Sequence, residues 1–315
     1  MNVISNLAEI EEPLKNPVLT IGNFDGVHRG HLVLFDKVKS IAKDIGGKSV
    51  VMTFEPHPIK VVKPGNGPPL ITPFKQKIKL IADAGIDVII CIPFTNEFAT
   101  ISAQDFIREI LVGKIGVKEI IVGYDYSFGK DRSGNIDLLR DMGNELGYRV
   151  HVVDPVQLNH TLVSSTSIRD LVREGDLPEA KRLLGRDYRI SGKVKKGMGR
   201  GGRLLGFPTA NLLPEDELIP KNGVYAVIVY IEGVIYFGVC NIGNNPTFGG
   251  TTLSIETHIL DFSGDILGKE ITIVFTHRLR EEKTFSSKEE LADEITKDIE
   301  KAKGLLDLHE KGQGK

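Results

Sequence analysis

The sequence predicts two domains of different class: an α/β domain with a parallel sheet over residues 1–186, and an antiparallel β-barrel with a terminal helix over residues 187–315. Three observations predict this. The chain has 315 residues, enough for two domains. Strand-like and helix-like segments alternate through the first half, as in βαβ units. Near 185–188 the pattern changes to short β-rich runs bounded by glycine, proline and asparagine.

The elements of the first half follow from the spacing of its apolar residues. The predicted strands are Val18–Ile21, Ser49–Phe54, Val88–Ile92, Glu119–Val122 and Arg149–Val153, and the predicted helices cover 28–44, 73–84, 102–112 and 136–146. Two further helices are expected, one from about Ser165 and one from Asp176 to the glycine at 185. Ligands of parallel sheets bind beyond the carboxyl ends of the strands, so the loops after these strands are the first candidates for a site.

The second half is predicted to consist of short strands followed by one helix. The predicted strands are Tyr188–Val194, Gly223–Ile231, Val234–Asn241, Leu253–Leu260 and Glu270–Thr276. Glu232 and Gly233 are typical of a tight hairpin turn between two of them. The closing helix is expected to begin after Ser287, which can cap it together with Glu290.

The composition predicts an ordinary soluble protein. It is 41% hydrophobic and 26% charged, with a formal net charge of −2. No apolar run approaches the roughly 18 residues of a membrane span, and the N-terminal stretch lacks the pattern of a secretory signal. Cys91 and Cys240 lie in apolar runs, so we expect buried thiols in a reducing cytoplasm. The expected partners are small molecules, without nucleic acid or membrane, and the expected state is a monomer or weak oligomer.

The stretch TIGNFDGVHRGH, residues 20–31, joins a buried strand to a helix through a glycine-containing turn. Its His28 and His31 are three residues apart, which predicts that both lie on one face of the first helical turn. A helix N-terminus suits phosphate, and two imidazoles there can donate to a phosphate whose charge grows in a transition state. The alternatives are two exposed helix residues or two metal ligands, and the second lacks a cysteine or acid cluster of suitable spacing.

Three further motifs follow strands or open a helix in the first half. TFEPHP at 53–58 offers Phe54 for stacking a planar ligand, although a phenylalanine at a strand end more often belongs to the core. GYDYSFGK at 123–130 combines aromatic rings with a carboxylate, which suits a flat heterocycle or a loop that packs on itself. SSTSIR at 164–169 gathers hydroxyls at a helix start, with Arg169 able to bind phosphate; a simple serine cap is the alternative.

The second half opens with a basic stretch, 188–214, that holds six basic residues and no acid. It is either a solvated face or a phosphate site. Its basic residues are Arg189, Lys193, Lys195, Lys196, Arg200 and Arg203. Gly197, Gly199 and Gly202 match G-x-G-x-x-G but open no βαβ unit, so we interpret them as part of a flexible basic flap over phosphates.

Two candidate groups for phosphoryl transfer follow. In GFPTAN at 206–211, Thr209 and Asn211 point the same way on an extended strand and could hold Mg²⁺ and a nucleotide phosphate. Glu256 lies within the strand Leu253–Leu260. It either faces solvent or acts as a general base in the mouth of the barrel.

Together these motifs resemble those of the bifunctional bacterial riboflavin kinase/FMN adenylyltransferases, also called FAD synthetases. The resemblance covers nearly the whole chain. It rests on GNFDGVHRGH, TFEPHP, GYDYSFGKDRSGN and SSTSIR in the first domain, and on GRLLGFPTANL, PKNGVYA, SIETHILDF and RLREEKTF in the second. It implies a Rossmann-like nucleotidyltransferase domain of the HxGH type, followed by a riboflavin kinase barrel.

By this resemblance, His28 and His31 stabilise the α-phosphate of ATP while the FMN phosphate attacks it and pyrophosphate leaves. The nucleotide site of this domain would consist of Gly22, Phe24, Ser164, Ser165, Thr166 and Arg169, and the flavin site of Phe54, His57, Asp125 and Phe128. In the second domain, Thr209 and Asn211 would hold Mg²⁺–ATP, and Glu256 would take the proton from the riboflavin 5′-hydroxyl. The implied enzyme makes FMN and then FAD from riboflavin with two ATP.

Two departures from the family pattern lie in the second domain. Asn245 stands where the family usually has an arginine, and Leu267 where it commonly has a tyrosine. They leave two alternatives: a protein with only the adenylyltransferase half active, and a barrel that binds flavin as a non-catalytic regulatory module. Retention of Thr209, Asn211 and Glu256 argues against the second, because a sensor needs no general base.

Overall fold

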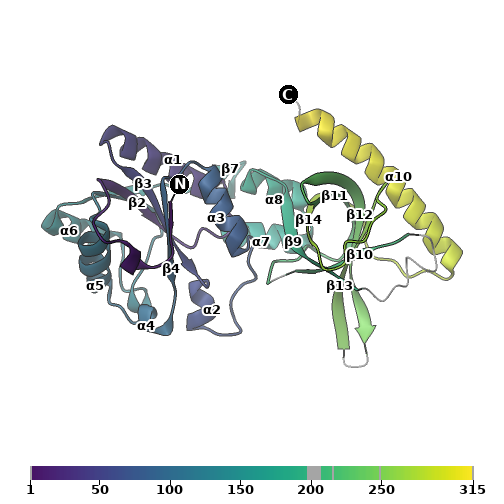
Figure 1. Ribbon diagram of the computed structural model, residues 1–315, viewed down its shortest axis with the longest axis horizontal. Coiled ribbons are helices and arrows are strands. Elements are labelled where there is room, and N and C mark those ends of the chain that lie inside the picture. The colour runs from purple at the N-terminus through teal and green to yellow at the C-terminus, as the bar shows by residue number, and fades with distance from the viewer. Residues whose placement is uncertain (1, 197–206, 215, 248–249, 314–315) are drawn as a thin grey trace. The chain divides into compact units, whose positions relative to one another are not determined.

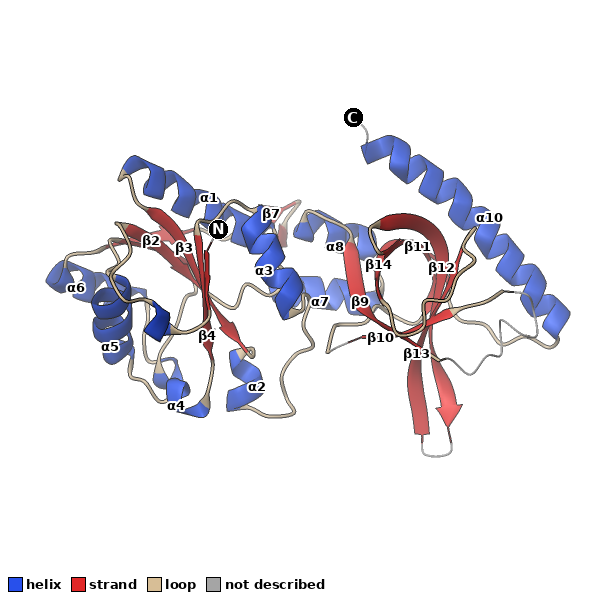
Figure 2. Ribbon diagram, viewed as in Figure 1, coloured by secondary structure: helices blue, strands red, loops and turns tan. Residues whose placement is uncertain are grey.

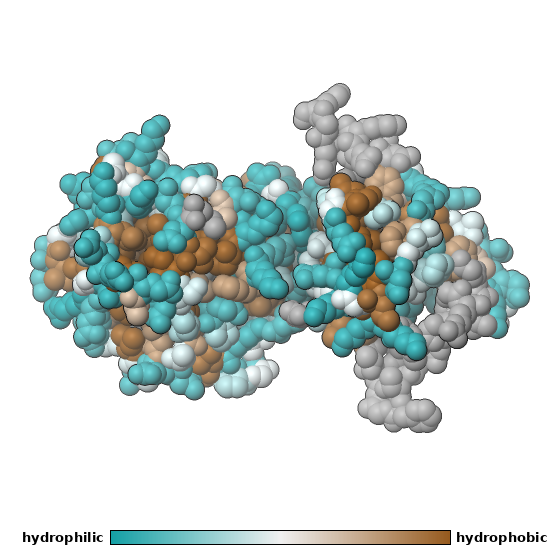
Figure 3. Space-filling model, in the orientation of Figure 1, coloured by the Kyte–Doolittle hydropathy of each residue, from teal (hydrophilic) through white to brown (hydrophobic). Residues whose placement is uncertain are grey.

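The computed structural model describes residues 2–196, 207–214, 216–247 and 250–313. The chain divides into two compact units, Met1–Ser165 and Thr166–Lys315 (Figure 1). Hydrophilic residues border the apolar ones on the face of each unit that Figure 3 shows. In the described part of the chain, no helix has both the length and the apolar character needed to cross a bilayer.

The first unit is built on a six-stranded parallel sheet, which confirms the predicted α/β class (Figure 2). From edge to edge the strand order is β1-β4-β3-β2-β5-β6. The strands are β1 (Asn2–Ile4), β2 (Pro17–Ile21), β3 (Lys48–Glu55), β4 (Val88–Pro93), β5 (Glu119–Gly123) and β6 (Arg149–Val153). The chain runs outward from β2 through β3 to β4 and then returns to β5 on the other side of β2. The order therefore reverses between β2 and β5, the position where such sheets bind ligands.

Helices cover both faces of this sheet. They are η1 (Leu7–Glu9), α1 (Arg29–Asp44), α2 (Pro58–Val62), α3 (Phe74–Asp83), α4 (Asn96–Ala99), α5 (Ala103–Asp105), η2 (Phe106–Ile115), η3 (Lys130–Arg132) and α6 (Ile136–Leu146). Phe35 of α1 and Ile81 of α3 pack against one face of the sheet, and η2 and α6 pack against the other. A small hairpin of β7 (Gln157–Leu158) and β8 (Thr161–Leu162) completes the unit.

The helix predicted over 102–112 differs from the prediction in its winding and its end. After the short α5, the chain forms a π-helix, η2, that continues to Ile115 and ends at Gly116, whose φ is 73°. The buried residues of η2 are Phe106, Ile107, Ile110, Leu111 and Ile115. The wider turn of a π-helix keeps residues at this spacing on one side, so all of them reach the sheet.

The second unit contains a closed antiparallel barrel, as predicted, with the strand order β10-β13-β12-β11-β14-β9. Its strands are β9 (Tyr188–Lys195), β10 (Ala210–Pro214), β11 (Gly223–Ile231), β12 (Val234–Thr247), β13 (Gly250–Ile259) and β14 (Glu270–Arg280). α7 (Ser165–Glu174) and α8 (Leu177–Leu184) precede the barrel, and α10 (Lys288–Gln313) follows it. The Ser287 hydroxyl accepts the Glu290 N–H at 3.1 Å, which is the predicted cap.

Alternate residues of the barrel strands face its interior or α10. Tyr225 and Phe275 pack edge to face with 5.3 Å between their ring centroids, whereas Val224 lies under Ala302 of α10. Arg280 of β14 donates to Asp298 of α10 with Nε, 3.1 Å from Oδ1, and with Nη2, 2.8 Å from Oδ2. This bidentate pair ties the helix to the barrel.

Both cysteines are buried free thiols, as predicted. Burial raises the pKa of Cys91 to about 11 and that of Cys240 to about 12.

Candidate active sites

The loop between β2 and α1 has a main-chain conformation that packing imposes. Phe24, Gly26 and Val27 have φ values of 48°, 91° and 38°. A positive φ is costly for a phenylalanine and more so for a β-branched valine. Both side chains are buried, and they pack with Phe35 and Ile81. The hydrophobic core thus holds a strained loop at the switch point of the sheet.

His28 lies at the N-cap of α1 and not in its first turn, because the helix begins at Arg29. Its Nδ1 accepts the N–H of His31 at 3.3 Å. When Nδ1 accepts, the proton of a neutral imidazole is on Nε2, which makes Nε2 a donor. The two rings stack with 3.5 Å between centroids and 19° between planes. The structure therefore brings both imidazoles together at the start of α1.

Asp25 was not singled out from the sequence, yet it fixes this loop. Its carboxylate is 3% exposed and accepts the N–H of Ile71 at 3.1 Å and the N–H of Thr72 at 3.0 Å. The main-chain oxygen of Asp25 accepts the hydroxyl of Ser165 at 2.8 Å. Asp25 thus joins the loop after β2 to the segment before α3 and to the first residue of α7.

Gly22 and Phe24 are in contact, and together they shape the loop after β2. A Cβ on Gly22 would lie 3.0 Å from the Phe24 ring, so glycine lets this ring pack against the main chain. The ring is 3% exposed and meets His31 edge to face, with 5.1 Å between centroids. Phe24 therefore supports the histidine pair with its buried side chain, and its part in the nucleotide site stays a prediction.

The SSTSIR motif spans the division between the two compact units. Ser164 and Ser165 belong to the first unit, where the Ser165 hydroxyl donates to Asp25 as described. Thr166 is exposed and Arg169 is buried, and both belong to the second unit. Arg169 follows Ser165 by four residues on α7, so they share a side of that helix. The part of Thr166 and Arg169 in the phosphate site stays a prediction.

The predicted flavin residues Phe54 and Phe128 are connected by a row of aromatic rings. Phe54 contacts Phe98 at 6.0 Å, Phe98 contacts Phe106 at 6.2 Å, and Phe106 contacts Phe128 at 5.8 Å between centroids. Tyr126 stacks on Phe128 at 5.5 Å with 18° between the planes. The end of β3 and the loop after β5 are therefore connected by one continuous row of aromatic rings.

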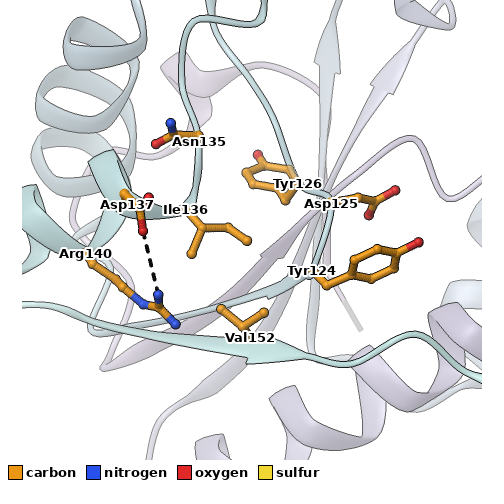
Figure 4. A pocket seen from close by; sticks show the side chains of 8 residues that line it. All are labelled: Tyr124, Asp125, Tyr126, Asn135, Ile136, Asp137, Arg140 and Val152. Atoms are coloured by element: carbon orange, nitrogen blue, oxygen red, sulfur yellow. Dashed lines mark ion pairs between the residues drawn. The ribbon is translucent and has the colours of Figure 1, made fainter.

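The other two predicted flavin residues differ in their surroundings. His57 is buried and caps α2, with its Nδ1 accepting the Ile59 N–H at 3.3 Å. Asp125 is exposed and lines an open cavity of about 410 Å³ at the carboxyl ends of β5 and β6. The cavity is also lined by Tyr124, Tyr126, Asn135, Ile136, Asp137, Arg140 and Val152 (Figure 4). Burial raises the pKa of Tyr126, so its hydroxyl stays protonated.

Lys77 of α3 is a buried cation beside these loops that sequence reasoning missed. It is 5% exposed, and its Nζ donates to the main-chain oxygen of Phe54 at 3.1 Å. Burial lowers the pKa of Lys77, and the charges of Glu55, Cys91 and Asp25 oppose that change. The Lys77 ammonium therefore fixes the end of β3 through this hydrogen bond, and its burial has a desolvation cost.

A row of polar residues crosses four neighbouring strands of the barrel. Lys195 of β9 is opposite Asn211 of β10, Asn211 is opposite Glu256 of β13, and Glu256 is opposite Asn241 of β12. Directly opposite residues of antiparallel strands point to the same face. The row thus gathers a cation, two amides and a carboxylate on one surface.

This row faces the outside of the barrel, which settles the position of Glu256. Val224 of β11 is opposite Asn241 and packs against α10 on the outer surface. Thr257, the neighbour of Glu256, is fully buried and points the other way. Glu256 lies half-buried on the outer face, which is the first of the two positions that the sequence left open; its role as a general base stays a prediction.

Two hydroxyls contact the Glu256 carboxylate. Ser254 donates to Oε1 at 2.8 Å, and Thr209 donates to Oε2 at 3.5 Å. Ser254 was missed from the sequence, although residues two apart on a strand share a face. Gly243 is opposite Ser254, and a Cβ on Gly243 would lie 1.9 Å from Oε1 of Glu282. A second carboxylate therefore lies against the main chain of β12 on this surface.

Several predicted features fall partly or wholly outside the described residues. The predicted flap with Gly197, Gly199, Gly202, Arg200 and Arg203 lies there entirely. Asn245 belongs to β12, but its side chain is not described. Leu267 is 57% exposed in the turn before β14. Among the residues that are described, no three histidine, cysteine, aspartate or glutamate side chains come together as a metal site.

Comparison with known proteins finds matches in both units. A family model described as FAD synthetase matches residues 10–167, and one described as riboflavin kinase matches residues 184–306. Relatives named bifunctional riboflavin kinase/FMN adenylyltransferase match along nearly their whole length. The one from Buchnera aphidicola of Acyrthosiphon pisum is 38% identical over 98% of this chain and 99% of its own. The one from Escherichia coli K12 is 37% identical over 94% of each chain.

A solved structure is similar over both units. The crystal structure described as a macrolide-efflux protein from Streptococcus pneumoniae has a TM-score of 0.85 and 31% identity to this chain. The match covers 96% of this chain and 98% of that one.

Proposed function

The chain belongs to the family of bifunctional riboflavin kinase/FMN adenylyltransferases, and we propose that each of its two reactions uses one of the sites described above. The enzyme phosphorylates riboflavin to FMN with ATP and transfers AMP from a second ATP to FMN, giving FAD and pyrophosphate. Family models match both halves of the chain. No observation favours either alternative, a protein with a single active half or a non-catalytic barrel.

Adenylyl transfer is assigned to the loop after β2. An oxygen of the FMN phosphate attacks the α-phosphorus of ATP, and the bond to pyrophosphate breaks. Nε2–H of His28 donates to the α-phosphate oxygens, and His31, stacked on it, keeps that ring in place. Charge stabilisation by fixed donors is the main contribution a protein makes to such a transfer. Gly22, Phe24, Ser164, Ser165, Thr166 and Arg169 complete the nucleotide site.

The flavin of FMN is assigned to the edge of the sheet between β3 and β5. The aromatic row from Phe54 to Phe128 gives this edge a rigid apolar floor. Asp125, in the neighbouring cavity, supplies a polar group for the edge of a flat heterocycle. His57 fixes the chain after β3 through its cap on α2.

Riboflavin phosphorylation is assigned to the outer face of the barrel, and the row from Lys195 to Asn241 is the observation that carries this assignment. Glu256 takes the proton from the 5′-hydroxyl of riboflavin, whose oxygen attacks the γ-phosphorus of ATP while ADP leaves. A half-buried carboxylate held by Ser254 is fixed in position for this proton transfer.

Thr209 and Asn211 are proposed to hold Mg²⁺ with ATP. The Thr209 hydroxyl and the Asn211 amide provide oxygen ligands, the kind that Mg²⁺ prefers, and both lie beside Glu256. When bound, Mg²⁺ neutralises charge on the transferred phosphate. We further place the enzyme in the cytoplasm as a monomer or weak oligomer without membrane or nucleic-acid partners; its two buried free thiols are compatible with a reducing compartment.

Two variants of the full chain test the assignment of one reaction to each site. His28→Asn keeps an N-cap acceptor but removes the Nε2 donor, so FAD formation from FMN should fall about 100- to 1,000-fold while FMN formation is unchanged. Glu256→Gln keeps the shape but removes the base, so FMN formation should fall at least about 100-fold while FAD formation from added FMN is unchanged. Both products are resolved by chromatography after incubation with riboflavin or FMN, ATP and Mg²⁺.

Lys37→Ala, on the exposed side of α1, serves as the matched control and should keep both activities. Equal loss of both activities in either variant would contradict the assignment of one site to each reaction.

A further inference from the structure

The strand that carries Asn211 leaves its ladder just before Thr209. Among the described residues, β10 pairs with β13 at two positions, and the outer of these is Ala210 opposite Thr257. Pro208 has no N–H and cannot donate to a neighbouring strand. Thr209 therefore lies beyond the main-chain bonds that fix Asn211, although both are assigned to the same Mg²⁺–ATP.

The imidazole of His258 attaches this segment to β13 instead. Its Nδ1 lies 2.9 Å from the main-chain oxygen of Pro208. Its ring meets Phe207 edge to face, with 5.5 Å between centroids and 89° between planes. Because a carbonyl oxygen only accepts, this contact requires the proton on Nδ1 of His258. One side chain thus holds the two residues that precede Thr209.

We propose that His258 is a positioning residue for riboflavin phosphorylation, which fixes the Pro208 main chain so that Thr209 meets Mg²⁺–ATP beside Glu256. His258 and Glu256 are two residues apart on β13 and point to the same face. The Thr209 hydroxyl lies 3.5 Å from Oε2 of Glu256, so a small displacement of Pro208 moves it out of reach. The inference rests on the proposed roles of Thr209 and Glu256.

The position of the contact predicts which kinetic constant it controls. His258 touches the segment before the proposed ATP ligand, whereas Ser254 and Thr209 contact the Glu256 carboxylate. Losing this contact should therefore raise the KM for ATP more than the KM for riboflavin. A side chain that only stabilised the barrel would instead lower the amount of folded enzyme, which reduces the maximal rate and leaves the KM for both substrates unchanged.

Three variants of the full-length enzyme test the inference. His258→Leu removes the donor, His258→Asn places an amide N–H near the position of Nδ1, and His258→Gln places one near the position of Nε2. In riboflavin phosphorylation, Leu and Gln should raise the KM for ATP about five- to tenfold, the loss expected for one hydrogen bond, with the KM for riboflavin unchanged. Asn should stay close to wild type. Circular dichroism and urea unfolding of the same samples report whether the barrel of each variant is folded.

A second readout needs no turnover. The ¹⁵N-histidine NMR signal of His258 is identified as the one that the wild type has and His258→Asn lacks. Its chemical shifts should be those of an imidazole with the proton on Nδ1. An Nε2–H form would overturn the inference, as would an unchanged KM for ATP in His258→Leu, or His258→Asn as impaired as His258→Leu. Intact FMN formation in Glu256→Gln would instead refute the kinase site itself, and the positioning role with it.

Discussion

The two proposed sites hold their side chains in opposite ways. The loop after β2 has three residues at positive φ and keeps its shape through a buried carboxylate, a histidine cap and close ring packing. The outer face of the barrel is regular: Lys195, Asn211, Glu256 and Asn241 are in line because four strands pair in register. One geometry depends on a few side-chain contacts and the other on the ladder of a whole sheet.

The comparison teaches where each site is vulnerable. A strained loop relaxes when one of its few contacts is lost, because its main chain has lower-energy conformations available. A residue on a strand keeps its direction as long as the register is kept, since a strand fixes which face each side chain occupies. Small changes should therefore harm adenylyl transfer more than riboflavin phosphorylation.

Asp25→Ala gives the largest expected effect. It removes the acceptor for two buried N–H groups, those of Ile71 and Thr72. Leaving them without partners should lower the free energy of unfolding of the first unit by about 2–4 kcal/mol. The released loop should lower FAD formation about 100-fold or more. Urea unfolding and chromatographic assay of FAD measure the two effects.

The control for this variant is Asp36→Ala on the exposed side of α1, whose carboxylate pairs with Lys39 of the same helix at 2.9 Å. It should leave stability and both activities within experimental scatter. If Asp25→Ala formed FAD at the wild-type rate, the loop would not depend on its buried clamp, and the comparison would fail.

The same difference explains what the sequence could predict. Where apolar residues recur regularly, the predicted elements have the same bounds as the observed ones. These are the helix over 136–146 and the strands Arg149–Val153 and Gly223–Ile231. β1 was missed because it is three residues long and pairs with a strand more than 80 residues away. The π-winding of η2 was missed because the apolar spacing predicts a helix without specifying its hydrogen bonds.

For the sites, motifs located the loops and strands but not the contacts between distant residues. The role of Asp25 depends on Ile71 and Thr72, 46 and 47 residues away. Alternation along β13 separated Glu256 from Thr257 but could not say which of them faced the interior. Asn241 joined the candidate site only when the register of β12 and β13 was known.

A pair of glycine substitutions sharpens the comparison at intermediate size. In Gly30→Ala, the new Cβ would lie 3.2 Å from Nδ1 of His28 and 3.3 Å from the Val163 oxygen. Displacing the His28 ring should lower FAD formation about tenfold, even though alanine favours the helix by up to about 1 kcal/mol. FMN formation should not change.

Gly243→Ala, the matched change on the barrel, creates a closer contact, 1.9 Å from Oε1 of Glu282. That atom ends a flexible, exposed side chain, which can turn away from its bond with Asn222. FMN formation should fall by no more than about threefold. Initial rates of both reactions in both variants measure the difference. A larger loss in Gly243→Ala than in Gly30→Ala would reverse the order that the comparison predicts.

Lys77→Met gives the smallest effect and tests the electrostatics of the first site. At pH 7 its free energy of unfolding should stay within about 1 kcal/mol of wild type, because the lost bond to the Phe54 oxygen and the relieved desolvation oppose each other. The pH dependence is more telling. Burial lowers the pKa of Lys77 in the folded protein below its ordinary 10.5, so between these two values the unfolded chain binds more protons than the folded one.

By linkage, the stability that Lys77 contributes must rise with pH across that window. Below the folded pKa both states carry the proton, and the folded state bears the full cost of a dehydrated ammonium. As pH increases toward 10.5 the folded protein releases the proton first, and the cost disappears. Urea unfolding of wild type and Lys77→Met at pH 7, 8.5 and 9.5 should therefore show the difference between them moving in favour of wild type. A difference that moved toward Lys77→Met would mean that Glu55 and Asp25 outweigh burial, and that the end of β3 is held by an ion pair.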